Sequence, residues 1–174
     1  MHFLKKIIFF LFLFSIFTQQ LYAELPYYLD FKYILNNSDA GKKAQSDLKV
    51  KLEGGLKSIS EREKIIQSEE KKIIEQKKII LLEEYKKKVA GLRKKVAKLQ
   101  KDRNILLDNV AKQRLKARNE LLKNLNPLIK EYMVKNKIRY VMDKKSLILA
   151  DENLDITKDI IKLLNNKLKA IKLN

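Results

Sequence analysis

Side chains able to carry out catalysis are scarce in this chain. Its 174 residues include one histidine, His2, and no cysteine. Beyond residue 2, thiolate catalysis, disulfides, Ser-His-Asp triads and ordinary zinc sites are therefore excluded. The carboxylates Asp30, Asp143 and Asp155 could cluster, but lone carboxylates beside strands and helix starts are usually turn or cap residues. We expect a protein that holds another molecule, with no enzymatic activity, no cofactor and no bound metal.

Positive charge is the other chemical feature of the sequence. The chain has 39 Lys+Arg against 21 Asp+Glu, a formal net charge of +18. Nine basic residues crowd into positions 86–103, where Asp102 is the only acid: Lys86, Lys87, Lys88, Arg93, Lys94, Lys95, Lys98, Lys101 and Arg103. This basic cluster could attract an anionic client or an anionic membrane surface. It could equally be the solvated face of a helix.

The first 23 residues have the pattern of a secretory signal peptide. Two lysines in Met1–Lys6 precede the apolar run Ile7–Phe17, and Leu21-Tyr22-Ala23 ends in a small residue. The run is too short to cross about 30 Å of hydrocarbon as a helix, so an uncleaved anchor is the weaker alternative. We expect cleavage after Ala23 and export to the periplasm of a bacterium with two membranes.

Residues 40–136 are composed of strong helix formers with heptad spacing. The seven-residue repeat comprises Leu52, Ile59, Ile66, Ile73 and Ile80. A second series alternates spacings of three and four through Val89, Leu92, Val96, Leu99, Arg103, Leu106 and Val110. One straight helix would be roughly 145 Å long. We therefore predict an antiparallel helical hairpin with its tip near residues 80–83, or alternatively near Gly91.

The seam of the first helix is expected to be thin. Between the isoleucines, the predicted partner positions are Leu56, Glu63, Glu70 and Lys77. Gly54 and Gly55 form either a hinge or a tolerated weak spot, since each glycine costs about 1 kcal/mol in a helix. Pro127 is expected to kink or interrupt the second helix.

The two chain ends are predicted to form a small β-body, from residues 24–39 and 137–174. A strand is expected over Tyr27–Asp30, and Ser38 or Asp39 is expected to cap the long helix. A β-hairpin is predicted from Ile138 to Leu149, followed by a helix that Asp155-Ile156-Thr157 can cap. The fold class is thus α+β and dominated by helix. Three short strands make too little core for one molecule, which predicts completion by other copies.

Motifs at both ends resemble the Skp/OmpH family of periplasmic chaperones. They are Tyr28-Leu29-Asp30, the stretch Ile34–Ala44, Tyr140–Lys144, and Asp155-Ile156-Thr157 followed by Ile160-Ile161. The matching structural residues are Asp30, Ser38, Gly41, Lys42, Asp143, Asp155 and Thr157. Leu29 in place of the usual valine, Pro26, and the lack of a glycine-rich tip depart from the family pattern.

The resemblance implies a trimeric "jellyfish" architecture: a homotrimer whose three hairpins surround a cavity. It also implies that the cavity holds unfolded outer-membrane β-barrel proteins, without ATP, and keeps them soluble for insertion. Two other readings stay open. One is a structural coiled-coil adaptor of the envelope, and the other is a basic nucleic-acid-binding protein, although nothing points to a specific nucleic acid.

Overall fold

Two long helices dominate the computed structural model, which describes residues 25–173. The expected signal peptide lies outside these residues. The helices are α2 (Phe31–Asn37), α3 (Asp39–Gln76), α4 (Leu82–Lys135) and α5 (Thr157–Lys167). The remaining elements are the strands β1 (Tyr27–Leu29) and β2 (Val141–Asp143) and the short 3₁₀ turns η1 (Lys144–Ser146) and η2 (Glu152–Leu154). Within the described part of the chain, no helix is long and apolar enough to cross a membrane.

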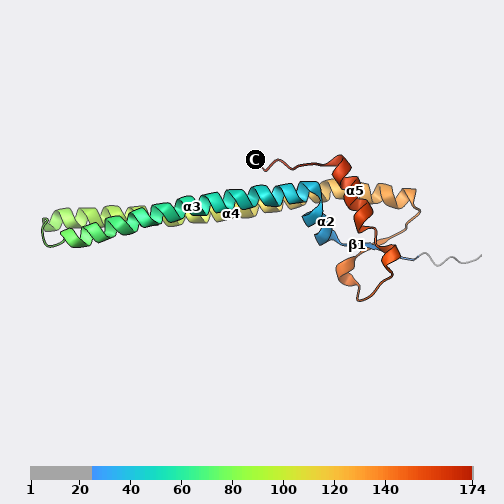
Figure 1. The fold of residues 1–174 in the computed structure, drawn as a ribbon, viewed down its shortest axis with the longest axis horizontal. Helices are drawn as coiled ribbons and strands as arrows, with labels where there is room; N and C mark the ends of the chain where they lie inside the picture. The colour runs from blue at the N-terminus through green and yellow to red at the C-terminus, as the bar shows by residue number, and fades with distance from the viewer. Residues whose placement is uncertain (1–24, 174) are drawn as a thin grey trace, which may run out of the picture.

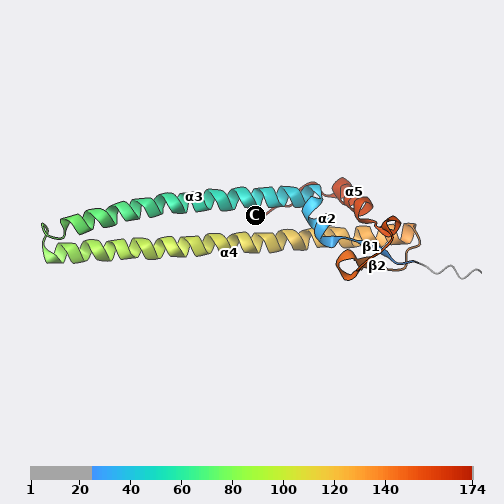
Figure 2. The ribbon, with the colours of Figure 1, turned by 60° about the horizontal axis from the view of Figure 1, so that its bottom comes forward.

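Helices α3 and α4 run antiparallel and side by side as one long arm (Figures 1 and 2). Residues 77–81 form the turn between them. Glu83 and Glu84 occupy the first turn of α4, where acidic side chains are favoured by the helix dipole. The predicted hairpin is confirmed, with its turn a few residues earlier than expected. Gly91 lies inside α4.

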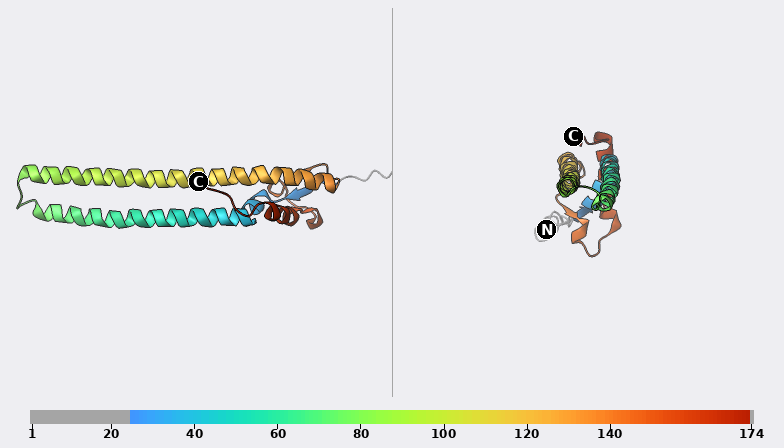
Figure 3. Two further views of the ribbon diagram at one scale, coloured as in Figure 1. Left: turned by 90° about the horizontal axis from the view of Figure 1, so that it is seen from above. Right: turned by 90° about the vertical axis from the view of Figure 1, so that its left-hand side faces the viewer.

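The body gathers at the open end of the hairpin (Figure 3). Strands β1 and β2 pair in parallel, with Tyr28 opposite Met142, and Tyr28 also bridges to Asp155. The core combines residues of β1, α2, α5 with the segments on either side of it, and the roots of both arm helices: Leu29, Ile34, Ala40, Ala44, Ala117, Leu121, Leu125, Leu128, Ile129, Ile156, Ile160, Leu164 and Ile171. The root of α4 is therefore one wall of the body.

The predicted β-hairpin at residues 138–149 is not present. After β2 the chain enters η1, and Leu147–Leu149 forms no strand. The Ile148 and Leu149 side chains are 105% and 91% exposed. β2 pairs with β1 instead of with its sequence neighbour, so Leu147–Leu149 has no strand to pair with in the described chain. Residues 25–173 contain two strands where the sequence predicted three.

Three of the four predicted partner positions in the α3 seam are wrong by one residue. Leu56 is half-buried as expected, but Glu63, Glu70 and Lys77 are exposed. Beyond Leu56, the half-buried positions between the heptad residues are Gly55, Arg62 and Glu69. On α4, Asp102 is likewise half-buried while Arg103 is exposed. Seam positions alternate steps of three and four, and the residue three after Leu52, Ile59 and Ile66 faces α4.

Pro127 does not interrupt α4, which continues to Lys135. A proline inside a helix costs about 3 kcal/mol because its nitrogen cannot donate to the preceding turn. On either side of Pro127, Leu125, Leu128 and Ile129 are buried in the core. Burial at roughly 1.5–3 kcal/mol for each of these side chains is enough to hold the helix together.

Candidate functional site: the arm and its anchor

A group of hydrogen bonds ties the arm to the body. The Asp30 carboxylate accepts from the Tyr33 N–H at 2.7 Å and so caps α2. The Asp30 N–H donates to Thr157 Oγ1 at 2.9 Å. The Thr157 hydroxyl donates to Asp155, whose carboxylate also accepts from the Thr157 N–H at 2.9 Å. The end of β1, the start of α2 and the start of α5 are thereby held at one point.

The charge of Asp155 is stabilised at this point. Burial by itself would raise the pKa of Asp155, but hydrogen bonds from Thr157 and Lys144 outweigh it and hold the pKa below its ordinary value. Lys144 lies 3.1 Å from Asp155, and this hydrogen bond raises the pKa of Lys144. Both groups are therefore charged at neutral pH, as expected for a fixed ion pair.

The three candidate catalytic carboxylates all serve as caps. Asp143 accepts from the Lys145 N–H at 3.2 Å and begins η1, while Asp30 and Asp155 act as described above. Among the described residues, no group of His, Cys, Asp or Glu could hold a metal ion. The arrangement is one of structural capping.

The corner between α2 and α3 depends on Ser38 and Gly41. Ser38 is fully buried, and its hydroxyl accepts from the Gly41 N–H at 3.2 Å as the predicted cap of α3. A Cβ at Gly41 would lie 1.9 Å from the Leu35 carbonyl oxygen, so only glycine fits there. Lys42, the next motif residue, is exposed on α3.

A further bond joins α4 to α5. The Tyr132 hydroxyl donates to Asp159 at 2.8 Å. Burial, and then the bond to this carboxylate, raises the pKa of Tyr132 to about 12. The phenol is therefore a permanent donor at physiological pH, and it fixes α5 against the arm root.

The basic cluster of residues 86–103 lies on the outer half of α4, but some of its charge is already neutralised. Lys86 pairs with Glu83 at 2.8 Å, Lys88 with Glu84 at 3.4 Å, and Lys95 with Glu69 of α3 at 2.6 Å. Within the described chain, the other six members form no ion pair and are exposed: Lys87, Arg93, Lys94, Lys98, Lys101 and Arg103.

Exposed aliphatic side chains accompany these cations along the arm. On α3, the turn and α4 they are Val50, Ile65, Ile74, Ile79, Leu81, Leu82, Val96, Ile105, Leu107 and Leu115. Sequence reasoning assigned such residues to the seam by default and could not name any as exposed. The only available signal was the run Ile79–Leu82, which interrupts the heptad and has more aliphatic side chains than a tight turn can bury.

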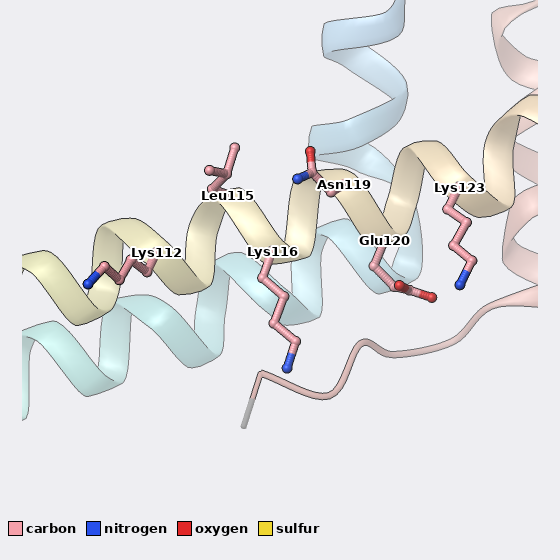
Figure 4. Close-up of a pocket in the computed structure, with 6 residues that line it drawn as sticks. All are labelled: Lys112, Leu115, Lys116, Asn119, Glu120 and Lys123. Atoms are coloured by element: carbon pink, nitrogen blue, oxygen red, sulfur yellow. The ribbon is translucent and has the colours of Figure 1, made fainter.

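A shallow hollow on the α4 root is open to solvent (Figure 4). It is lined by one helix face: Lys112, Leu115, Lys116, Asn119, Glu120 and Lys123. Figure 4 shows Lys116 and Glu120 directed toward the C-terminal segment, which passes beside α4. An open surface of this kind suits loose contact with a polypeptide better than enclosure of a small molecule.

The arm, the corner and the body together define a helical-hairpin protein built on a small α+β base. The sequence model of the family described as outer membrane protein (OmpH-like) matches residues 27–164. This match spans most of the chain, and the chain belongs to the OmpH-like (Skp/OmpH) family.

The fold is also found in a solved structure. A crystal structure of an OmpH-like protein from Caulobacter crescentus CB15, a candidate outer membrane chaperone, superposes with a TM-score of 0.79 at 20% identity. The match covers 85% of this chain and 89% of the other. At this identity the likeness shows a shared fold. The search of curated proteins gave no match.

Proposed function

We propose that this protein is an ATP-independent periplasmic holdase chaperone that binds unfolded outer-membrane β-barrel proteins and keeps them soluble until insertion. The observation that carries the proposal is the surface of the arm, where exposed aliphatic side chains lie among exposed lysines and arginines on two long helices. Membership of the OmpH-like family, and the chaperone description of the related Caulobacter protein, support it.

This surface suits an unfolded client physically. Ile65 and Leu115 are 59% and 55% exposed, and lysine stems beside them extend the apolar area while their ammonium groups stay in water. Each contact is weak, which lets a client leave without an energy source. Many such contacts at high effective concentration still hold the client.

The proposal includes a homotrimer whose three arms surround the client. Among the described residues, a single body contains one pair of three-residue strands, and Ile148 and Leu149 next to it are uncovered. A strand edge and an apolar run left open at the body are what an association between bodies would cover. Three basic clusters would then face one cavity and speed the capture of anionic clients.

One sizing experiment tests both parts. The purified protein is run by size exclusion with light scattering, alone and after mixing with a urea-unfolded outer-membrane barrel protein diluted from denaturant. We expect a trimer alone and a soluble trimer–client complex in the mixture. A well-folded monomer that leaves the barrel protein to precipitate would contradict the proposal.

The periplasmic location has a separate test, because it depends on residues outside the described part of the chain. Intact mass measurement of the protein from a periplasmic extract should show a chain that begins at Glu24. A chain that retains Met1 and fractionates with the cytoplasm would contradict export.

A further inference from the structure

The turn between the arm helices has an uncovered apolar surface. Ile79, Leu81 and Leu82 are 83%, 79% and 66% exposed, and Ile74 on the preceding turn of α3 is 59% exposed. They lie at the end of the molecule farthest from the body (Figures 1 and 2). We call Ile74, Ile79, Leu81 and Leu82 the apolar tip.

The backbone of the turn is fixed, so the apolar tip is presented in a defined shape. The N–H groups of Ile79 and Ile80 donate to the Gln76 carbonyl at 2.9 and 3.1 Å. The Lys77 ammonium lies 5.8 Å from the centre of the Tyr85 ring. Ile80 is half-buried inside the turn while Ile79 and Leu81 on either side face water. Ordering of this turn around exposed aliphatic residues is unfavourable unless something covers them.

Positive charge surrounds the apolar tip. Residues 71–88 contain seven lysines and three glutamates, a net charge of +4. Glu83 and Glu84 are already paired with Lys86 and Lys88, whereas Lys77, Lys78 and Lys87 are exposed and form no ion pair among the described residues. Apolar residues at the end of an element with lysines set behind them form the pattern of interfacial membrane binding.

We propose that the apolar tip inserts into the interfacial layer of a bilayer that carries anionic lipid. The aliphatic side chains would enter the acyl boundary, and the lysines would remain at the level of the headgroup phosphates. A lipid surface fits better than a peptide because the apolar residues cap the turn at the end of the hairpin and lysines lie within the turn and on both helices next to it. The proposal does not depend on client holding. The apolar tip would contact the membrane, and the rest of the arm would contact the client.

The absence of tryptophan from the chain makes a local test direct. Leu81→Trp places a single reporter on the apolar tip, and Val50→Trp places a matched one at a position that is 68% exposed near the root of the arm. Each variant is mixed with vesicles of phosphatidylethanolamine and phosphatidylglycerol, with and without brominated acyl chains. We expect a blue shift and quenching by bromine for the tip reporter and neither for the arm reporter. Vesicle binding without a response at the tip would overturn the proposal.

Binding measurements add a test that does not depend on the reporter. Replacement of Ile79, Leu81 and Leu82 by Ser should lower partitioning onto the anionic vesicles by about tenfold or more. The control Val50→Ser with Ile65→Ser should leave partitioning unchanged. All five side chains are exposed, so circular dichroism should show intact helices. Equal partitioning of both variants would contradict insertion.

Two further measurements, the dependence of binding on lipid charge and the binding of a client, distinguish membrane insertion from a client contact. Neutral phosphatidylcholine vesicles should bind more weakly, and added salt should weaken binding to the anionic ones. The triple Ser variant should lose far less client holding than vesicle partitioning, because the other exposed aliphatic side chains of the arm remain in place. A blue shift of the tip reporter with the unfolded protein and none with vesicles would identify a client contact and refute the membrane assignment.

Discussion

At the start of α5, one carboxylate connects three segments of the chain. Asp155 accepts two hydrogen bonds from Thr157, whose hydroxyl in turn accepts from Asp30, and it pairs with Lys144. Its side chain is 22% exposed, so water screens these bonds only partly. A residue in this position controls how firmly the body holds together.

Asp155→Asn should therefore lower the free energy of unfolding by about 1–3 kcal/mol at neutral pH. The pKa of Asp155 in the folded protein lies below the ordinary value of 3.8. The stabilising contribution of the carboxylate is therefore complete above that pH and is lost as the pH falls through the folded pKa. Urea unfolding at a series of pH values should show the two proteins converging in acid. Asp151→Asn neutralises a comparable acceptor of the Asn153 N–H in an exposed turn and should have a smaller effect.

Gly54 and Gly55 are neighbours with different surroundings. A Cβ at Gly54 would meet nothing within 4 Å, whereas one at Gly55 would lie 2.5 Å from Leu106 Cδ2 across the seam. Gly54→Ala should raise the free energy of unfolding by about 1 kcal/mol through helix propensity. Gly55→Ala should show a smaller gain or a loss, because Leu106 must move. Thermal unfolding of the two variants checks the difference, and equal gains would contradict it.

The same pair tests the hinge hypothesis, which stays a prediction. If Gly54 and Gly55 allow the arm to bend around a client, Gly54→Ala should weaken holding while it stabilises the arm. Aggregation of an unfolded barrel protein, followed by light scattering, measures holding. Unchanged holding would favour the tolerated weak spot.

At the scale of the arm, polar bonds link the two helices. Arg62 of α3 meets Asp102 of α4 at 2.7 Å, and Glu69 meets Lys95 at 2.6 Å. Because these pairs join fixed positions on opposite helices, they set the register that the aliphatic seam leaves loosely specified. The register of the two helices is consequently sensitive to salt, although buried aliphatic side chains such as Ile59 and Leu99 hold them together.

A charge swap at Arg62 and Asp102 tests whether this ion pair helps to set the register of the two helices. Arg62→Ala or Asp102→Ala should each destabilise the arm by up to about 1 kcal/mol, since both side chains are partly exposed. Combining Arg62→Asp with Asp102→Arg should recover part of the loss. Denaturant unfolding at low and high salt measures the coupling, which should shrink as salt rises. Strictly additive effects would show that the pair contributes nothing to register.

The outer half of α4 should control the speed of client capture. Replacement of six cluster residues by Gln should slow capture and flatten its salt dependence: Lys86, Lys87, Lys88, Arg93, Lys94 and Lys95. Stopped-flow mixing with an unfolded barrel protein measures the rate. A matched control removes six exposed lysines at the root of α3: Lys42, Lys43, Lys49, Lys51, Lys57 and Lys64. Unchanged association at low salt would leave the cluster as a solvated helix face.

At the scale of the whole molecule, the proposed trimer places its interface at the body. Ile148→Asp with Leu149→Asp should convert the proposed trimer to monomers, because two carboxylates would be buried in the interface. Both side chains are fully exposed in one chain, so the fold of the monomer should survive. Size exclusion with light scattering measures the state. Val50→Asp with Ile65→Asp is the control on the arm and should leave the assembly intact.

Residue patterns within short stretches of the sequence were sufficient to predict the long helices and where they begin. The heptad repeat predicts the hairpin, Glu83 and Glu84 predict where α4 begins, and Ser38 predicts the cap of α3, as the structure confirms. These features depend on residues within one or two turns of each other. The family motifs are also short stretches, at the two ends of the chain, so the resemblance to the Skp/OmpH family can be recognised from the sequence alone.

Contacts between distant segments were decided only by the tertiary structure. The sequence does not show that β2 pairs with β1, that Gly55, Arg62 and Glu69 face α4, or that α4 continues through Pro127. Strand partners and seam partners are chosen by competition among all available surfaces, and the burial of Leu125, Leu128 and Ile129 outweighs a local proline penalty. Which aliphatic side chains stay exposed is a result of that same competition. The sequence shows that Ile79–Leu82 interrupts the heptad, but not which of these side chains are exposed.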